Sequence, residues 1–243
     1  MTSPLLIGRR RERYGVLQVP FDEEPDGPLE FPDPQEADAD GLVGAGGDLT
    51  PESLVQAYRS GIFPWYDEAS PLLWWSPDPR AVLPLERLHV SRRLARRCRR
   101  RDYRLSWDEA FPEVMRRCGE NRDDGTWILP EMVDAYSELH RRGLAHSFEV
   151  WVDGELAGGL YGVLVGGLFA AESMFHRHTD ASKIALVAAV RSVFAAGVEL
   201  FDVQFLTPHL ASMGATNWRR SLYLARLAEL RNKRIGPLVV PEL

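Results

Sequence analysis

The stretch from Gly166 to Leu206, GGLFAAESMFHRHTDASKIALVAAVRSVFAAGVELFDVQFL, predicts a strand, a loop, a helix and a second strand. Leu168 to Glu172 is a short apolar run that ends on a carboxylate. Asp180 is a favourable helix N-cap, and apolar residues then recur at the 3.6-residue period of a core-facing helix. Gly197 suits the left-handed residue after a helix, and the chain then resumes as strand. A right-handed crossover would make the two strands parallel and bury the second on both faces.

Two polar side chains stand out on that second strand. Side chains alternate across a sheet, so Asp202 and Gln204 are expected to share one face. Burying both without partners would cost about 1–3 kcal/mol for each group, and more for the charge. Either they form a structural hydrogen-bond network or they line a site, and Glu172 at the end of the neighbouring strand favours a site. The opposite face is expected to carry Phe201, Val203 and Phe205.

Composition limits the class of protein. A chain of 243 residues is longer than a usual single core, which favours two domains. We expect a cytoplasmic protein, because no apolar run approaches a membrane span and the N-terminus lacks the pattern of a signal peptide. Two cysteines make neither a disulfide framework nor a zinc site. Nothing in the sequence requires more than one copy, so we expect a monomer.

The first part of the chain predicts an arm, a helix and an aromatic cluster. Residues 1–30 are expected to form a flexible arm, rich in acid and proline towards its end. A helix should follow Thr50, with Pro51 at its first position and Gly61 after its end. The glycines before it lack the Lys-Ser/Thr of a phosphate loop. The aromatic cluster after it is either a proline-stiffened small core or a platform for base stacking: Trp65, Tyr66, Trp74 and Trp75.

Positive charge is concentrated in one segment of this otherwise acidic chain, whose net charge is −6. RLHVSRRLARRCRRRDYR, from Arg87 to Arg104, holds nine arginines against one acid, Asp102. Ser91 is a suitable N-cap for a helix here. Such a charged face is usually only solvated, but unmixed positive charge costs self-repulsion unless an anion is bound. We therefore favour a polyanion site, with nucleic acid as the ligand.

The second half predicts a mixed sheet. Two helices are expected, at 107–119 and 130–142, and strands at 146–152, 156–164 and 168–172 then form an antiparallel meander. Asp153-Gly154 and Gly166-Gly167 suit its tight turns. With the following helix and strand, the fold class is α+β. This order is like that of the acyl-CoA N-acyltransferase (GNAT) fold.

Several motifs together resemble the leucyl/phenylalanyl-tRNA–protein transferase family. They are GLVGAGGDLTPESLVQAYRSGIFPWY, LLWWSPDPRAVL, DGTWI, AHSFEVW, GGLYGV, AESMFHR with ASK, FDVQFLTPHLASMGA and a trailing RR, nearly collinear from Phe31 to Leu230. The resemblance implies a small N-terminal domain at 31–84, a GNAT-like catalytic domain at 85–243, and no metal, CoA or other cofactor. It implies transfer of leucine or phenylalanine, with methionine left open, from aminoacyl-tRNA to the N-terminal Arg or Lys of proteins. The product would be marked for N-end-rule degradation.

The resemblance also implies roles for individual residues. Asp202 and Gln204 match a pair that assists peptide-bond formation, and Glu172 matches a site position. Trp65 and Trp127 match tryptophans that bind the 3′ adenosine and its aminoacyl group; Phe169 and Met174 match further site positions. Ala188-Ala189 and Asn217-Trp218 depart from the family pattern, so the shape of the amino-acid pocket is not implied. The basic residues that match a tRNA-binding cluster are Arg92, Arg96, Arg99 and Arg100.

The chemistry of such a site is simple. An aminoacyl ester is already activated, and an α-amine with a pKa of about 7.7–8.0 needs no strong base. Alignment, a proton acceptor and oxyanion stabilisation remain to be supplied. We expect Asp202 to orient the amine and ease its proton loss, Gln204 to relay that hydrogen bond, and Glu172 to attract the acceptor's cationic end.

Three alternatives stay open. A CoA-dependent N-acetyltransferase would need a glycine-containing pyrophosphate loop, which MFHRHTDASK lacks. A non-catalytic RNA-binding module would explain the arginines and tryptophans but not Asp202 with Gln204. A zinc enzyme built on His176 and His178 lacks a third ligand at suitable spacing.

Overall fold

Two β-sheets make up the part of the chain that can be described. The structure is a computed structural model, and it describes residues 29–100, 102–120 and 126–243. The predicted arm at 1–30 therefore lies outside the described residues except for its last two. Of these, Leu29 is buried, and its side chain fills the space beside Gly47.

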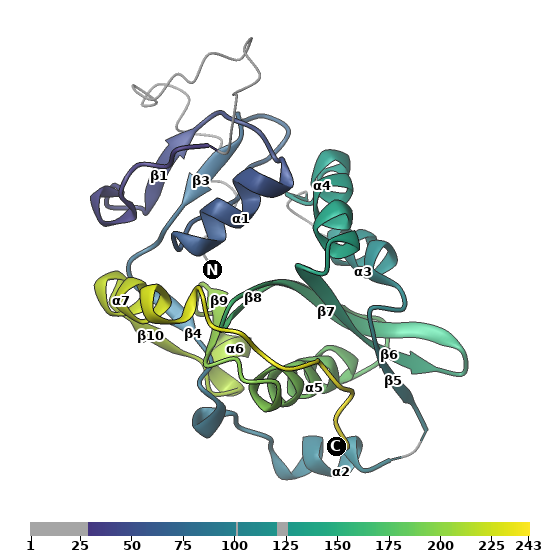
Figure 1. Cartoon of the computed structure of the whole chain (residues 1–243). Coiled ribbons are helices and arrows are strands. Elements are labelled where there is room, and N and C mark those ends of the chain that lie inside the picture. Colours follow the sequence, from purple (N-terminus) through teal and green to yellow (C-terminus); the bar gives the residue numbers. More distant parts are fainter. Residues whose placement is uncertain (1–28, 101, 121–125) are drawn as a thin grey trace.

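The smaller sheet and one helix form the N-terminal domain (Figure 1). Its three antiparallel strands lie in the order β1–β3–β2. The helix begins as the sequence predicts, because the Thr50 hydroxyl accepts from the Ser53 amide at 3.3 Å and Pro51 occupies the first turn. The elements are η2 (Pro34–Glu36), β1 (Leu42–Ala45), α1 (Pro51–Arg59), β2 (Phe63–Pro64) and β3 (Leu73–Trp75).

The aromatic cluster divides between core and surface. Tyr66, Trp74 and Trp75 are buried in the core, and the indole N–H groups of both tryptophans donate to backbone carbonyls. For these three the prediction of a small hydrophobic core is confirmed. Trp65 is only half-buried and remains available to contact a ligand.

The larger sheet has seven strands in the order β10–β4–β9–β8–β7–β6–β5. Neighbours are antiparallel except β8 and β9, which are parallel and joined by helix α5. This confirms the predicted α+β class with a meander, a helix and a parallel strand. The strands are β4 (Arg80–Val82), β5 (Arg104–Trp107), β6 (Ala145–Val152), β7 (Glu155–Val165), β8 (Leu168–His176), β9 (Leu200–Gln204) and β10 (Thr216–Trp218).

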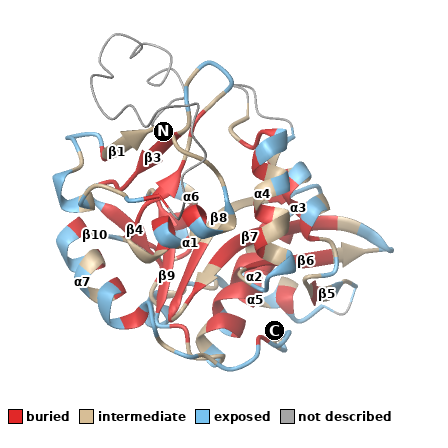
Figure 2. Ribbon diagram, turned by 45° about the horizontal axis from the view of Figure 1, so that its top comes forward, coloured by how far each residue is buried: buried red, intermediate tan, exposed pale blue. Residues whose placement is uncertain are grey.

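Helices cover both faces of the larger sheet. Helices α1, α3 and α4 contact strands β6 to β8 from one side, and α5 contacts the same strands from the other (Figure 1). Strands β4 and β9 are buried along their whole length (Figure 2). The helices are η3 (Leu85–Arg87), α2 (Arg92–Cys98), α3 (Phe111–Gly119), α4 (Pro130–Arg141), α5 (Ala181–Ala195), α6 (Pro208–Ser212) and α7 (Arg220–Leu230).

Two local predictions are wrong. The helix expected at 107–119 begins only at Phe111, because Arg104–Trp107 pairs with β6 as an edge strand. Asp180 does precede α5, but its side chain caps no amide. It adopts a left-handed conformation with φ of 66°, and its carboxylate instead accepts from Arg93 at 2.9 Å and lies 3.5 Å from Lys183.

The boundary between the two domains falls before β4. A division at residue 84 would assign β4 to the N-terminal domain, yet this strand pairs with β9 and β10 in the larger sheet. We therefore propose the boundary at residues 76–79. Within the described ranges, no helix has the length and apolar character needed to cross a membrane.

Candidate active site

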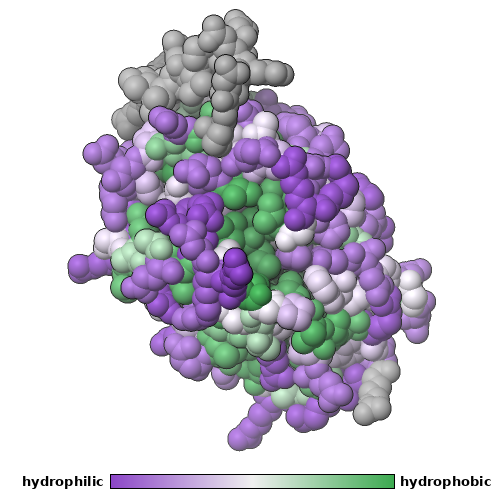
Figure 3. All heavy atoms as spheres, viewed as in Figure 1, coloured by the Kyte–Doolittle hydropathy of each residue, from purple (hydrophilic) through white to green (hydrophobic). Residues whose placement is uncertain are grey.

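A pocket of about 320 Å³ lies where the two domains meet. Its walls come from β2, from the loop before α4, from a single residue of β8 and from the end of β9 with the turn into α6. Figure 3 shows apolar atoms gathered at the centre of one face, bordered by hydrophilic atoms on both sides. The lining residues are Phe63, Pro64, Trp65, Trp127, Glu172, Val203, Gln204, Phe205, Leu206, Thr207 and Leu210.

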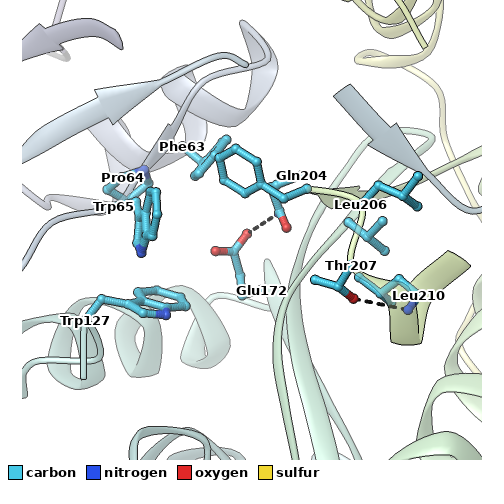
Figure 4. A pocket seen from close by; sticks show the side chains of 11 residues that line it. Phe63, Pro64, Trp65, Trp127, Glu172, Gln204, Leu206, Thr207 and Leu210 are labelled. Carbon is cyan, nitrogen blue, oxygen red and sulfur yellow. Dashed lines mark hydrogen bonds between the residues drawn. The ribbon is translucent and has the colours of Figure 1, made fainter. Parts of the chain in front are cut away.

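Two half-buried tryptophans form one end of the pocket. Trp65 is braced by Trp75, with ring centroids 5.9 Å apart, and by Phe205 at 5.5 Å. Trp127 faces it from the segment before α4 (Figure 4). The structure thus brings together the two tryptophans for which the family resemblance implies binding of the 3′ adenosine and its aminoacyl group. A base stacked on such a ring is held by about 1–3 kcal/mol.

Glu172 and Gln204 meet at the middle of the pocket (Figure 4). The Gln204 side-chain amide donates to the Glu172 carboxylate at 3.1 Å. Each lies at an irregularity in its strand pairing: Glu172 is the extra residue of β8 opposite Tyr161–Gly162, and β9 shifts register against β4 just before Gln204. Such β-bulges re-aim side chains and are frequent beside active sites.

The Gln204 backbone is strained. Its φ is +55°, a left-handed conformation that costs a non-glycine residue of order 1–3 kcal/mol. It therefore needs a compensating contact. The backbone N–H of Gln204 supplies this contact by donating to the Asp202 carboxylate at 2.9 Å.

Glu172 is a partly buried carboxyl group in the wall of the pocket. Burial raises its pKa from 4.5 to about 8, and the nearby Asp202 charge adds to this; a Tyr58 hydrogen bond and the Arg80 charge act in the opposite direction. The Tyr58 hydroxyl is also 2.6 Å from that of Tyr136, and both tyrosines are buried. A protonated carboxyl is therefore well populated here near neutral pH.

Glu172→Gln should stabilise the protein at high pH only. The folded-state pKa of about 8 lies above the unfolded value of 4.5, so the stability that Glu172 contributes is full below pH 4.5 and is lost as the pH rises through 8. Glutamine keeps the acceptor oxygen and cannot ionise. We expect equal Tm values at pH 4 and a higher Tm for the variant at pH 9, by about 2–4 °C for each kcal/mol that ionisation costs. If the Tm difference between the variant and the wild type is the same at both pH values, this prediction is wrong. Glu68→Gln changes an exposed carboxyl group and serves as the control.

Asp202 lies behind the pocket wall and is sealed from solvent. Its Oδ1 accepts from Arg80 Nε at 2.9 Å and from the backbone N–H of Gln204. Its Oδ2 accepts from Arg80 Nη2 at 2.6 Å and from the Tyr223 hydroxyl at 2.9 Å. Because both oxygens are occupied and Asp202 does not line the pocket, the expectation that it binds the incoming amine directly has no support in this geometry. Of the two interpretations of the pair, Asp202 fits the structural network and Gln204 fits the site.

Phe169 and Met174 do not line this pocket. Phe169 is fully buried on the α5 side of the sheet, with its ring centroid 5.3 Å from that of Phe201. Met174 is partly buried against the same core. Alternation already places Glu172 on the face opposite Phe169 and Ala171. The extra residue in β8 shifts the alternation after it, so that Met174 packs on the same side as Phe169.

The arginine segment forms α2, which packs against α5 on the side of the sheet away from α1 (Figure 1). Ser91 caps it as predicted, accepting from the Leu94 amide at 3.2 Å. Arg92, Arg96 and Arg99 are exposed and have no ion pair within the described ranges. Arg100 is also exposed, but its guanidinium lies 3.2 Å from the Asp102 carboxylate, which offsets part of its charge.

Sequence reasoning missed the residues that support the pocket from behind. Arg80 belongs to the WWSPDPRAVL motif and is a charged residue next to an apolar run, which is a usable signal. Nothing local in the sequence marks Tyr58 or Tyr223. As for metals, no group of three or more potential ligands is present within the part of the chain that the structure describes.

Comparison with known proteins gives consistent family matches. The family model described as leucyl/phenylalanyl-tRNA protein transferase matches residues 82–228, and the model of that family's N-terminal domain matches residues 47–78. A relative from Anaeromyxobacter sp. (strain Fw109-5) is 57% identical over 202 residues, covering 82% of this chain and 86% of the relative. One from Chromobacterium violaceum is 56% identical over 191 residues, covering 78% and 82%. Both carry the name leucyl/phenylalanyl-tRNA–protein transferase.

Solved structures show only distant likeness. A GCN5-related N-acetyltransferase from Kribbella flavida is 10% identical, with a TM-score of 0.39 over 66% of this chain and 58% of that one. L-PGS from Bacillus licheniformis is 13% identical, with a TM-score of 0.38 over 67% and 55%. At this level the likeness carries no information about substrate.

Proposed function

Because the chain belongs to the leucyl/phenylalanyl-tRNA–protein transferase family, and so is an aminoacyltransferase, we propose that transfer takes place in the pocket between its two domains. The aminoacyl group would come from leucyl- or phenylalanyl-tRNA. The acceptor would be the N-terminal α-amine of a protein that begins with Arg or Lys. The modified protein would then be a substrate for N-end-rule degradation.

The pocket supplies alignment. The 3′ adenosine would stack between Trp65 and Trp127, which sets its ester near Gln204 at the middle of the pocket. Holding amine and ester in a reactive geometry lowers the barrier by several kcal/mol, and this is the main requirement for an activated ester. The observation that carries the proposal is that both tryptophans, Glu172 and Gln204 line one pocket.

Gln204 would orient the attacking amine, and Asp202 would act only through it. The amine loses one proton as its nitrogen bonds to the ester carbonyl carbon, and the tRNA 3′ oxygen gains a proton as it leaves. Glu172 is positioned to accept the first proton or to donate the second. A cationic acceptor side chain would favour its ionised form, because an opposite charge lowers the pKa of a carboxyl group.

The exposed arginines of α2 would bind the tRNA backbone. Lysine and arginine contacts to phosphates supply sequence-independent, salt-sensitive affinity. This suits an enzyme that must accept more than one tRNA. We assign this role to Arg92, Arg96 and Arg99. Arg100 would contribute less, because Asp102 offsets part of its charge.

The direct test is transfer of labelled leucine and phenylalanine from charged tRNA to peptides that differ only in their first residue. Arg- and Lys-led peptides should be labelled at least tenfold faster than an Ala-led peptide, and no CoA should be required. Glu172→Gln should reduce the preference for the cationic first residue. Equal labelling of all three peptides would remove the proposed acceptor specificity, and salt-sensitive tRNA binding without any transfer would leave an RNA-binding module.

A further inference from the structure

Arg80 is a fully buried guanidinium behind the pocket, in contact with Phe63 of one wall and with Asp202, which binds the Gln204 backbone of the other. It is 1% exposed. Nε and Nη2 donate to the two oxygens of Asp202 at 2.9 and 2.6 Å, and Nη1 donates to the Gly61 carbonyl at 3.0 Å. Burial alone would lower its pKa, but the attraction of Asp202 outweighs this and raises it, so the guanidinium stays charged.

One side of this contact leads to Gln204. The Asp202 oxygen that Arg80 Nε contacts also accepts the Gln204 backbone amide at 2.9 Å. That amide belongs to the residue with φ of +55°, which aims its side chain at Glu172. The orientation of Asp202 therefore fixes where the Gln204 side chain enters the pocket.

The other side leads to the tryptophan wall. Gly61 immediately precedes the segment into β2, and the Arg80 guanidinium lies 4.8 Å from the Phe63 ring centroid. Phe63 lines the pocket beside Trp65, and both rings contact Phe205. One side chain thus connects the wall that would bind adenosine with the wall that carries Gln204.

Tyr223 completes the arrangement from α7. Its hydroxyl donates to Asp202 Oδ2 at 2.9 Å, and its ring lies under the guanidinium with 4.6 Å from Cζ to the centroid. It is fully buried and lines no part of the pocket. The hydrogen-bond contacts of its hydroxyl are with Asp202 and Arg80.

We propose that Arg80 and Tyr223 are positioning residues for aminoacyl transfer: they hold Asp202 so that the strained Gln204 and the Trp65 wall face each other at the reactive spacing. A buried ion pair is weak evidence for stability, since apolar residues of similar volume often serve as well or better. We attribute the presence of this ion pair behind the pocket to its effect on the positions of the two pocket walls. The inference rests on the proposed role of Gln204 in transfer.

The test compares steady-state transfer by the full chain carrying Tyr223→Phe, Asp202→Asn, both changes, or Arg80→Lys. Tyr223→Phe should lower kcat about 5- to 10-fold with KM for aminoacyl-tRNA within twofold, because only the alignment is lost. In the double variant, Tyr223→Phe should add nothing to the loss caused by Asp202→Asn, since both act on one network. Arg80→Lys should lower kcat and also raise KM, because an ammonium cannot keep both the paired contact and Gly61.

Ser192→Ala is the matched control. It also removes a buried hydroxyl, one that donates to the Val239 carbonyl at 2.6 Å far from the pocket, and it should leave both constants unchanged. A kcat for Tyr223→Phe equal to that of the wild type, or multiplicative losses in the double variant, would overturn the inference while leaving the proposed function in place. Absence of transfer by the wild-type protein would overturn both.

Discussion

Gln204→Ala is expected to lower kcat for aminoacyl transfer by about 100-fold while the protein remains folded. The variant loses the only side-chain amide that faces Glu172 within the described pocket wall. If the attacking amine depends on this group for its orientation, a loss of about two orders of magnitude is the usual size for a misplacement of about 1 Å or for the loss of one preorganised donor. The measurement is single-turnover transfer from charged tRNA to an Arg-led peptide.

The control must separate alignment from folding and from tRNA binding. Alanine keeps a backbone amide for Asp202, so the Tm should fall little, and binding of charged tRNA should stay within about threefold of wild type. Gln204→Glu has nearly the same shape but removes the donor and faces Glu172 with a second carboxyl group. It should be at least as inactive. Transfer by Gln204→Ala within about twofold of wild type would end the assignment.

Regular elements of the fold could be predicted because their signals are local. The cap at Thr50, the 3.6-residue apolar period of α5 and the turn at Asp153–Gly154 each act within a few residues, and each appears where expected. β5 was missed for the opposite reason. Arg104–Trp107 is an edge strand whose pairing with β6 depends on residues about 40 positions away, so nothing nearby distinguishes it from a helix start.

The site was predictable in its members but not in its geometry. Strict alternation places Asp202 and Gln204 on one face and Phe205 with Phe201 on the other. The register shift at the end of β9 and the left-handed Gln204 break that pattern, so Gln204 faces the pocket, Asp202 faces Arg80, and Phe205 packs with the N-terminal domain. Bulges of this kind follow from tertiary contacts and leave no periodic signal.

Reversing the charge of three arginines on α2 is expected to reduce tRNA affinity by at least 100-fold at low salt. Arg92, Arg96 and Arg99 are exposed and have no ion pair within the described residues, so their charge is free to meet phosphates. Each lost phosphate contact lowers the slope of log K against log salt by about 0.7–0.9. The triple change to Glu should therefore flatten the slope by about two to three, with little change in Tm because none of the three is buried.

The matched control changes the net charge equally at other positions. Arg219, Arg231 and Arg234 lie outside α2, are exposed and have no ion pair within the described residues, so their reversal tests whether any added negative charge repels tRNA. The two triple variants start from the same net charge of −6 and become equally acidic, so a difference between them isolates the position of the charge. Equal losses would mean that only the overall field matters. If the α2 variant bound tRNA with the affinity of the wild type, the tRNA site would lie elsewhere. The arginines around α2 would then have no assigned ligand.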